Sequence, residues 1–199
     1  LYPEFPHDPI KDFIPISLVS RAPLLLLVHP SLPVKSVKEL IALARVKPGA
    51  LDMGVSQGSH VHLASVYFTS MANMTVTSVP YKGGAQVIVD TIGGQINMAF
   101  VNSLAALPHV RSGKLRPLGI SSAERSSVVP ELPTISESGV RGYDVSAWSG
   151  WFAPAATPTA IIDKLNAELG RIARSPDISD AAPKMNTLRF NGRIVSVKL

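Results

Sequence analysis

Hydrophobic and polar positions change their period several times along the 199-residue chain, which predicts short alternating strands and helices. Ile16–Val19 and Pro23–Val28 are predicted to be two strands. The unbroken apolar run from Leu24 to Val28 predicts that the second strand is buried on both faces. A helical period then runs from Val37 to Ala44. Ser36 and Glu39 stand at its start with the spacing of a capping box, so a helix begins there.

The stretch from Leu51 to Tyr81 predicts a strand, a turn, a helix and a second strand. The turn is Ser56-Gln57-Gly58-Ser59, in which Gly58 supplies backbone freedom and Ser59 is a suitable N-cap. Apolar residues recur after Ser59 at helical spacing. A helix that begins in such a turn presents unpaired N–H groups and the positive end of its dipole, which favours an anionic ligand.

The same alternation continues to about residue 121. We expect strands at 74–79, 96–101 and 115–121 and helices at 85–92 and 103–112. This β-α-β-α-β-α-β order predicts an α/β fold with a largely parallel sheet and flanking helices. Turns at 56–59, 81–84 and 102–103 then follow carboxyl ends of strands, the edge at which open α/β sheets bind ligands.

The C-terminal third predicts a strand over Tyr143–Ala153 and then a helix. Trp148 and Trp151 lie in this strand, where packing in the core is the favoured interpretation and the wall of a cleft is the alternative. Thr157 is the expected N-cap, with Pro158 in the first helical turn. The expected buried face of this helix contains Ile161, Ile162, Leu165, Leu169 and Ile172. From Asp177 onward no convincing period is present.

Composition and charge narrow the function. The chain is 46% hydrophobic and 17% charged, with no cysteine and a formal net charge of +5. Its basic residues are scattered, so we expect no nucleic-acid partner, while a mild positive charge suits an anionic small ligand. His60 and His62 are two positions apart and do not share a helix face, so no metal site is expected. No cofactor is expected either, and no apolar run reaches the ~18 residues of a membrane span.

A catalytic alternative comes from Gly54-Val55-Ser56-Gln57-Gly58, which fits the G-x-S-x-G elbow of serine hydrolases. Ser56 would then be the nucleophile. Such an enzyme needs an acid and then a histidine later in the chain, and the available pair is Asp90 and His109, both in expected helices. We therefore expect no enzyme, with a hydrolase using Ser56 as the alternative.

An ordered set of short strings identifies a family resemblance. The strings are Pro9–Phe13, His29–Pro33, Val37–Ala44, Gly58-Ser59 with His62-Leu63-Ala64, Val79–Gly84, Gly93–Gln95, Gly113–Arg116, Leu132–Thr134 and Ala153-Pro154. In this order and spacing they resemble the Bug family, the TctC-like extracytoplasmic solute receptors of tripartite tricarboxylate transporters. The resemblance extends over roughly residues 3–176.

The resemblance implies a type II periplasmic binding protein fold, in which two α/β lobes close over a small carboxylate. It also implies delivery to a membrane permease, a periplasmic location and no catalysis. Carried over to this chain, the implied ligand-binding residues are Ser56, Gln57, Gly58, Ser59, His62, Tyr81, Lys82, Gly83, Gly84 and Asn102.

The chain also departs from the family pattern. Family members have most of a first lobe before the position of Tyr2, and the stretch after Pro176 does not match their usual ending. The first residues do not have the pattern expected of a signal peptide. We therefore expect a truncated relative with exposed apolar surface, and a non-functional remnant of the receptor is the alternative. The expected parts are a partial first lobe at 1–30, a ligand-binding lobe at 31–122 and a return to the first lobe at 123–199.

Overall fold

The structure is a computed structural model, and it describes residues 6–178. The expected aperiodic segment from Asp177 lies almost wholly outside this range. The chain divides into two compact units: unit 1 comprises residues 1–22 and 148–199, and unit 2 comprises residues 23–147. We expected boundaries at 30/31 and 122/123 instead, and the observed ones lie at 22/23 and 147/148.

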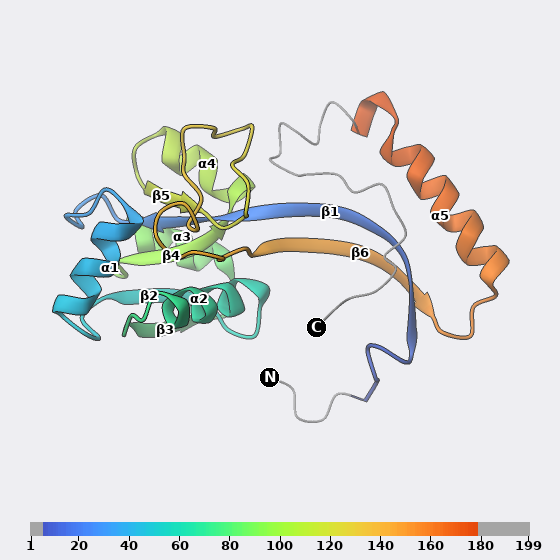
Figure 1. The fold of residues 1–199 in the computed structure, drawn as a ribbon, viewed down its shortest axis with the longest axis horizontal. Helices are drawn as coiled ribbons and strands as arrows, with labels where there is room; N and C mark the ends of the chain where they lie inside the picture. The colour runs from blue at the N-terminus through green and yellow to red at the C-terminus, as the bar shows by residue number, and fades with distance from the viewer. Residues whose placement is uncertain (1–5, 179–199) are drawn as a thin grey trace. The chain divides into compact units, whose positions relative to one another are not determined.

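Unit 2 is built on a sheet whose strands follow the order β3-β2-β4-β1-β5 (Figure 1). These strands are β1 (Phe13–Val28), β2 (Asp52–Ser56), β3 (Thr77–Tyr81), β4 (Met98–Asn102) and β5 (Arg116–Ile120). β2 runs parallel to both β3 and β4, whereas β1 runs antiparallel to β4 and to β5. The expected α/β class with a largely parallel sheet is confirmed, and among these five strands β1 is the reversed one.

Helices cover both faces of this sheet. They are α1 (Val37–Val46), α2 (His60–Met71), α3 (Gly84–Ile92) and α4 (Ser103–Arg111). One face packs against α1 and α2, and the other packs against α3 and α4, because the buried residues of these pairs fall in separate clusters. Leu24 to Val28 are fully buried and alternate between the two clusters, so the expectation of a strand covered on both faces is confirmed.

Residues 123–147 pack with unit 2 through side chains in both of its buried clusters and through specific hydrogen bonds. The Tyr143 side chain is buried, stacks against Phe100 and donates a hydrogen bond from its hydroxyl to the Ala64 carbonyl at 3.0 Å. The Ser121 hydroxyl accepts from the Leu24 N–H at 2.7 Å and donates to the Val145 carbonyl at 2.6 Å. These contacts tie the segment to the sheet of unit 2.

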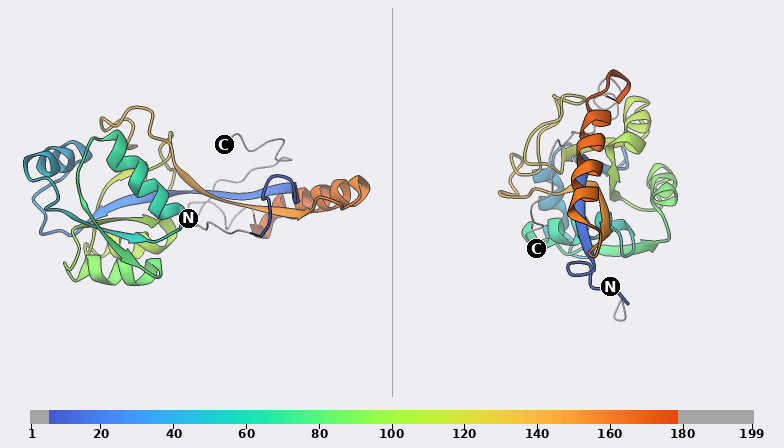
Figure 2. Two further views of the ribbon diagram at one scale, coloured as in Figure 1. Left: turned by 90° about the horizontal axis from the view of Figure 1, so that it is seen from below. Right: turned by 90° about the vertical axis from the view of Figure 1, so that its right-hand side faces the viewer.

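Unit 1 contains a two-stranded ribbon and one helix. β6 (Ser146–Pro154) pairs with β1, and α5 (Thr159–Ala173) follows β6 (Figure 2). Its buried hydrophobic cluster consists of Ile16, Ala153 and Ile162. The Asn166 amide donates to the Ile16 carbonyl at 2.6 Å and fixes the helix to the ribbon.

Several expectations about these elements were wrong. Phe13–Val28 forms one continuous strand where we expected two. α5 has Pro158 as its N-cap, without a side-chain hydrogen bond, because Thr157 is held in the preceding turn by its N–H to the Pro154 carbonyl. Of the five residues expected on the buried face of α5, Ile161, Leu165 and Ile172 are exposed. Trp148 and Trp151 are 52% and 55% exposed, so they are not core residues.

Candidate ligand-binding site

The first expected turn forms where β2 gives way to α2. Gly58 has φ +77°, a left-handed conformation that a residue without a side chain adopts at little cost. Ser59 is the N-cap of α2, as predicted: its hydroxyl accepts from the His62 N–H at 3.3 Å and donates to the Ser56 carbonyl at 2.6 Å. The turn is therefore a rigid start for α2 at the carboxyl end of β2.

Hydrogen bonds within this turn determine which of its backbone N–H groups remain open. The Gly58 N–H donates to His62 Nδ1 at 3.3 Å, and the Ser59 N–H donates to the Ser56 carbonyl at 3.1 Å. The N–H groups of His60 and Val61 have no acceptor among residues 6–178. The open donors thus lie one or two residues further along than the sequence indicated, and the sequence interpretation missed His60 and Val61.

The second expected turn joins β3 to α3. The Tyr81 hydroxyl donates to Asp90 Oδ2 at 2.8 Å, and burial, followed by this hydrogen bond and the nearby carboxylates, raises the pKa of Tyr81 to about 12. Its hydroxyl proton is therefore already engaged within unit 2. Lys82 is exposed beside it, and Gly83 caps α3 in an extended conformation. The N–H groups of Gly84, Ala85 and Gln86 have no acceptor within the described chain.

The third expected turn places Asn102 at the end of β4, as the N-cap of α4. Asn102 Oδ1 lies 3.4 Å from His60 Nε2, so residues 42 positions apart in the sequence meet across the ends of β2 and β4. The connections that follow these two neighbouring strands lead to opposite sides of the sheet. β2 is followed by β3 on one side, and β4 is followed by β5 on the other. Ligands of open α/β sheets bind at such a switch point.

All three turns lie at one edge because their strands are parallel neighbours. Ser56 pairs in register with Tyr81, and Met53 and Gly54 of β2 pair with Met98 and Ala99 of β4. The structure thus brings the ten predicted residues to a common edge. The side chains of Ser59, His62 and Tyr81 already form hydrogen bonds within unit 2. Whether they contact a ligand stays a prediction.

Electrostatics at this edge favour an anion. The first turns of α2, α3 and α4 contain no acidic residue, whereas α1 carries Glu39 in its first turn, with its N–H bonded to Ser36. The positive ends of α2, α3 and α4 are therefore not compensated by a carboxylate from their own first turns.

Other kinds of site find less support in the described chain. Residues 6–178 contain no group of three or more His, Cys, Asp or Glu side chains placed to hold a metal ion. In the same range, no helix has the length and apolar character needed to cross a membrane.

The hydrolase alternative depends on Ser56. Ser56 is the last residue of β2, and its carbonyl accepts both donors of Ser59. Among the described residues, no histidine nitrogen is hydrogen-bonded to the Ser56 hydroxyl, and His62 Nδ1 accepts from Gly58 instead. Gly54, the first glycine of the motif, has a packing role, since a Cβ there would overlap the Ile96 side chain. The motif is explained by the turn and by packing.

Comparison with known proteins places the chain in one family. Residues 1–192 match the model of the tripartite tricarboxylate transporter family receptor. BugT of Bordetella pertussis is 34% identical over 182 residues, covering 91% of this chain and 56% of BugT. R. palustris Rpa4515, solved with adipate, is 36% identical with a TM-score of 0.87, covering 97% of this chain and 65% of that one.

MatC from Rhodopseudomonas palustris, solved with bound malate, is 30% identical with a TM-score of 0.82, covering 95% of this chain and 65% of that one. The chain thus spans little more than half of BugT and about two thirds of each solved receptor. Family and fold are those of solute-binding receptors.

Proposed function

The chain belongs to the family of tripartite tricarboxylate transporter receptors, as its ordered motifs predicted, and we propose that it recognises a small dicarboxylate at the edge of unit 2 that contains Ser56, Tyr81 and Asn102. In this proposal it acts outside the cytoplasm, delivers the ligand to a membrane permease and catalyses no reaction. A tripartite transporter named in the family description and relatives described as periplasmic support the partner and the location.

The observation that carries the proposal is the set of open backbone donors at this edge. His60 and Val61 begin α2, and Gly84, Ala85 and Gln86 begin α3, each with an N–H that lacks an acceptor within residues 6–178. A carboxylate is acceptor-only, so it can use several such donors at once, and the positive helix ends favour its charge.

The size and charge of the ligand follow from the relatives and from the edge itself. Rpa4515 was solved with adipate and MatC with malate, two dicarboxylates of different length. In this chain one carboxylate would be held at the start of α2 and α3, with Lys82 as an exposed cation beside it. His60 and Asn102, 3.4 Å apart, would meet the part of the ligand that lies over β4.

Gln86→Glu is the sharpest test because it separates binding from stability. The new carboxylate stands in the first turn of α3, where it stabilises the helix by about 0.3–1 kcal/mol but repels a bound anion. We expect adipate or malate, titrated calorimetrically into the full chain, to bind roughly tenfold more weakly, equivalent to about 1.4 kcal/mol. Thermal unfolding of the variant should occur at the same temperature or slightly higher.

Gln95→Glu is the matched control. Gln95 is also exposed and also follows α3, but it lies beyond the C-terminus of that helix, at the other end of the sheet. It adds the same charge to the chain and should leave binding unchanged. Equal weakening by both variants would mean that only net charge matters, and unaltered binding in Gln86→Glu would remove the start of α3 from the site.

A further inference from the structure

Asn102 occupies the N-cap position of α4, but its side chain does not cap the helix. Asparagine is favoured at an N-cap because its side-chain oxygen accepts a hydrogen bond from an N–H of the first turn. At Asn102 no such bond forms, and Asn102 Oδ1 lies 3.4 Å from His60 Nε2 of α2 instead. The amide therefore points toward the start of another helix, and α4 does not depend on it.

The contact between His60 and Asn102 lies where a ligand can reach it. Both side chains are exposed, and they come from the first turn of α2 and the end of β4 at the same edge of the sheet. His60 also has an open backbone N–H within the described chain. One residue thus supplies a backbone donor for a carboxylate and, beside it, a ring that is joined to Asn102.

The two side chains keep both a donor and an acceptor for a ligand. Asn102 Oδ1 can only accept, so His60 Nε2 donates, which leaves His60 Nδ1 as an acceptor and the Asn102 amide nitrogen as a donor. With the amide turned over, Nδ1–H would be the donor and Oδ1 the acceptor, so the combination is the same. Neither side chain has another hydrogen-bond partner within residues 6–178.

This combination differs from that of the open backbone groups at the same edge. The N–H groups at the starts of α2 and α3 can only donate, which suits a carboxylate that can only accept. A hydroxyl group donates and accepts, so it suits the contact between His60 and Asn102. An ammonium group can only donate, and the positive ends of the helices oppose its charge.

Other polar side chains at this edge are less suited to holding a hydroxyl group. The Tyr81 hydroxyl is engaged with Asp90. Gln57 and Gln86 are exposed, and within residues 6–178 neither amide has a hydrogen bond that fixes its orientation. His60 and Asn102 instead orient each other across two strands, which is the preorganisation that a selective site needs.

We propose that His60 and Asn102 together bind a hydroxyl group on the carbon next to a ligand carboxylate, so that the chain prefers 2-hydroxy dicarboxylates. The position follows from His60, whose N–H would bind the carboxylate while its ring lies beside the adjoining carbon. The inference rests on the proposed function, since it places a dicarboxylate at the same edge, and it adds the substituent that distinguishes one dicarboxylate from another.

Three four-carbon dicarboxylates test this preference because they differ only at the second carbon. Malate carries a hydroxyl group there, succinate a hydrogen atom and aspartate an ammonium group. In calorimetric titrations of the full chain, the better-bound enantiomer of malate should have a dissociation constant about tenfold lower than that of succinate, equivalent to about 1.4 kcal/mol. Aspartate should bind more weakly than succinate.

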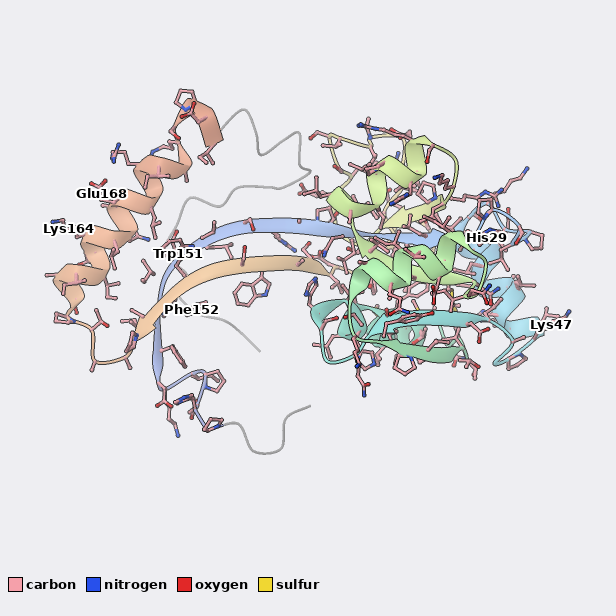
Figure 3. The ribbon with its side chains drawn as sticks, turned by 180° about the vertical axis from the view of Figure 1, so that it is seen from behind. His29, Lys47, Trp151, Phe152, Lys164 and Glu168 are labelled. Carbon is pink, nitrogen blue, oxygen red and sulfur yellow. The ribbon has the colours of Figure 1, made fainter. Side chains whose placement is uncertain are left out.

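His29 offers a matched control at the opposite end of the sheet. Its Nδ1 lies 2.6 Å from Ser31 Oγ, so it too is a histidine with a side-chain partner. It follows Val28, which pairs with Met98 at the start of β4, whereas Asn102 ends that strand. Figure 3 shows His29 at the end of unit 2 that also contains Lys47.

Two variants each remove one member of the contact. His60→Phe and Asn102→Ala should both bring the ratio of the succinate and malate dissociation constants from about ten to about one. Asn102→Ala should unfold at nearly the same temperature as the unaltered chain, because no capping bond is lost. His29→Phe should keep the preference for malate.

Several results would overturn the inference. Malate that binds no more tightly than succinate to the unaltered chain would overturn it while leaving the proposed function in place. A preference that survives in both His60→Phe and Asn102→Ala would overturn it as well, and so would a preference that only Ser56→Ala abolishes, since the hydroxyl would then lie at Ser56. Binding of neither adipate nor any of the three acids would overturn the proposed function and this inference together.

Discussion

The two units differ greatly in the number of hydrophobic residues that they bury. Unit 2 contains two buried hydrophobic clusters of 21 and 13 residues, one on each face of its sheet. The described part of unit 1 contains one cluster of three residues. Both units are built from amphipathic strands and helices, so the difference lies in how many faces find a partner.

The difference follows from the helices, which cover both faces of the sheet in unit 2 and bury its apolar residues. In unit 2 the Leu24–Val28 stretch of β1 is fully buried between the two helical layers. In unit 1 the same strand continues into a ribbon with one helix beside it, and aromatic side chains of β6 stay exposed. We therefore expect most of the free energy of unfolding to reside in unit 2, and unit 1 to depend on additional contacts.

The largest expected effect comes from comparing one core truncation in each unit. Phe100 is buried and packs against Phe68 and Tyr143, with ring centroids 5.5 and 6.2 Å away. Phe100→Ala should destabilise unit 2 by about 3–5 kcal/mol. Ile162→Ala should loosen unit 1 alone. Urea unfolding followed by circular dichroism reports mainly unit 2, and tryptophan fluorescence reports unit 1, which contains both tryptophans.

In the unaltered chain, the fluorescence transition should precede the circular dichroism transition. Phe100→Ala should move the latter to lower urea concentration, and Ile162→Ala should move mainly the former. Coincident transitions that shift together in both variants would show that the units unfold as one, and the comparison drawn above would fail.

A smaller effect is expected at Gly54, where the tight packing of unit 2 can be tested directly. A Cβ at this position would overlap Ile96 and lie 3.0 Å from the Val87 side chain. Gly54→Ala should therefore destabilise unit 2 by about 1–3 kcal/mol in urea unfolding. Gly84→Ala is the control, since no atom lies within 4 Å of a Cβ there. Equal stability of the two variants would mean that the layer between β2 and α3 can readily repack.

The smallest effect concerns the Tyr81–Asp90 hydrogen bond. Tyr81→Phe removes it and should cost about 1 kcal/mol of unfolding free energy near neutral pH. Because the pKa of Tyr81 is raised to about 12 in the folded protein, its contribution is complete below pH 10 and is lost as the pH rises toward 12.

Urea unfolding of both proteins from pH 8 to 11.5 tests this sign. The stability difference between the unaltered chain and Tyr81→Phe should narrow above pH 10. A stability difference that stays constant over this range would mean that the pKa of Tyr81 is the same in the folded and unfolded protein. The hydroxyl would then contribute through packing alone. Adipate binding should be unchanged by the substitution, because the hydroxyl is already engaged with Asp90.

Local signals allowed several elements and caps to be predicted from the sequence. Ser36 with Glu39 and Ser59 with His62 form the expected caps, since their hydrogen bonds join residues three positions apart. The run from Leu24 to Val28 is buried on both faces, as its lack of polar positions predicted. The family and the α/β class also followed from the sequence, because the motifs occur in order along the chain.

Contacts over long sequence separations could not be predicted in this way. The 3.4 Å approach of His60 to Asn102 depends on the order β2-β4 in the sheet, which no local pattern contains. The use of the Gly58 N–H by His62 moved the open donors to His60 and Val61. Residues 123–147 are held on unit 2 partly by Tyr143, whose hydrogen-bond partner Ala64 is 79 positions away.

The sequence by itself determined the alternation of strands and helices, the capped helix starts and the family, because each depends on neighbouring residues or their order. On α5, tertiary structure alone decided which apolar residues are buried. Ile161 and Ile162 are adjacent and equally apolar, yet one is 49% exposed and the other fully buried. The helix period places apolar residues in a stripe. How much of this stripe is buried depends on the elements that pack against it.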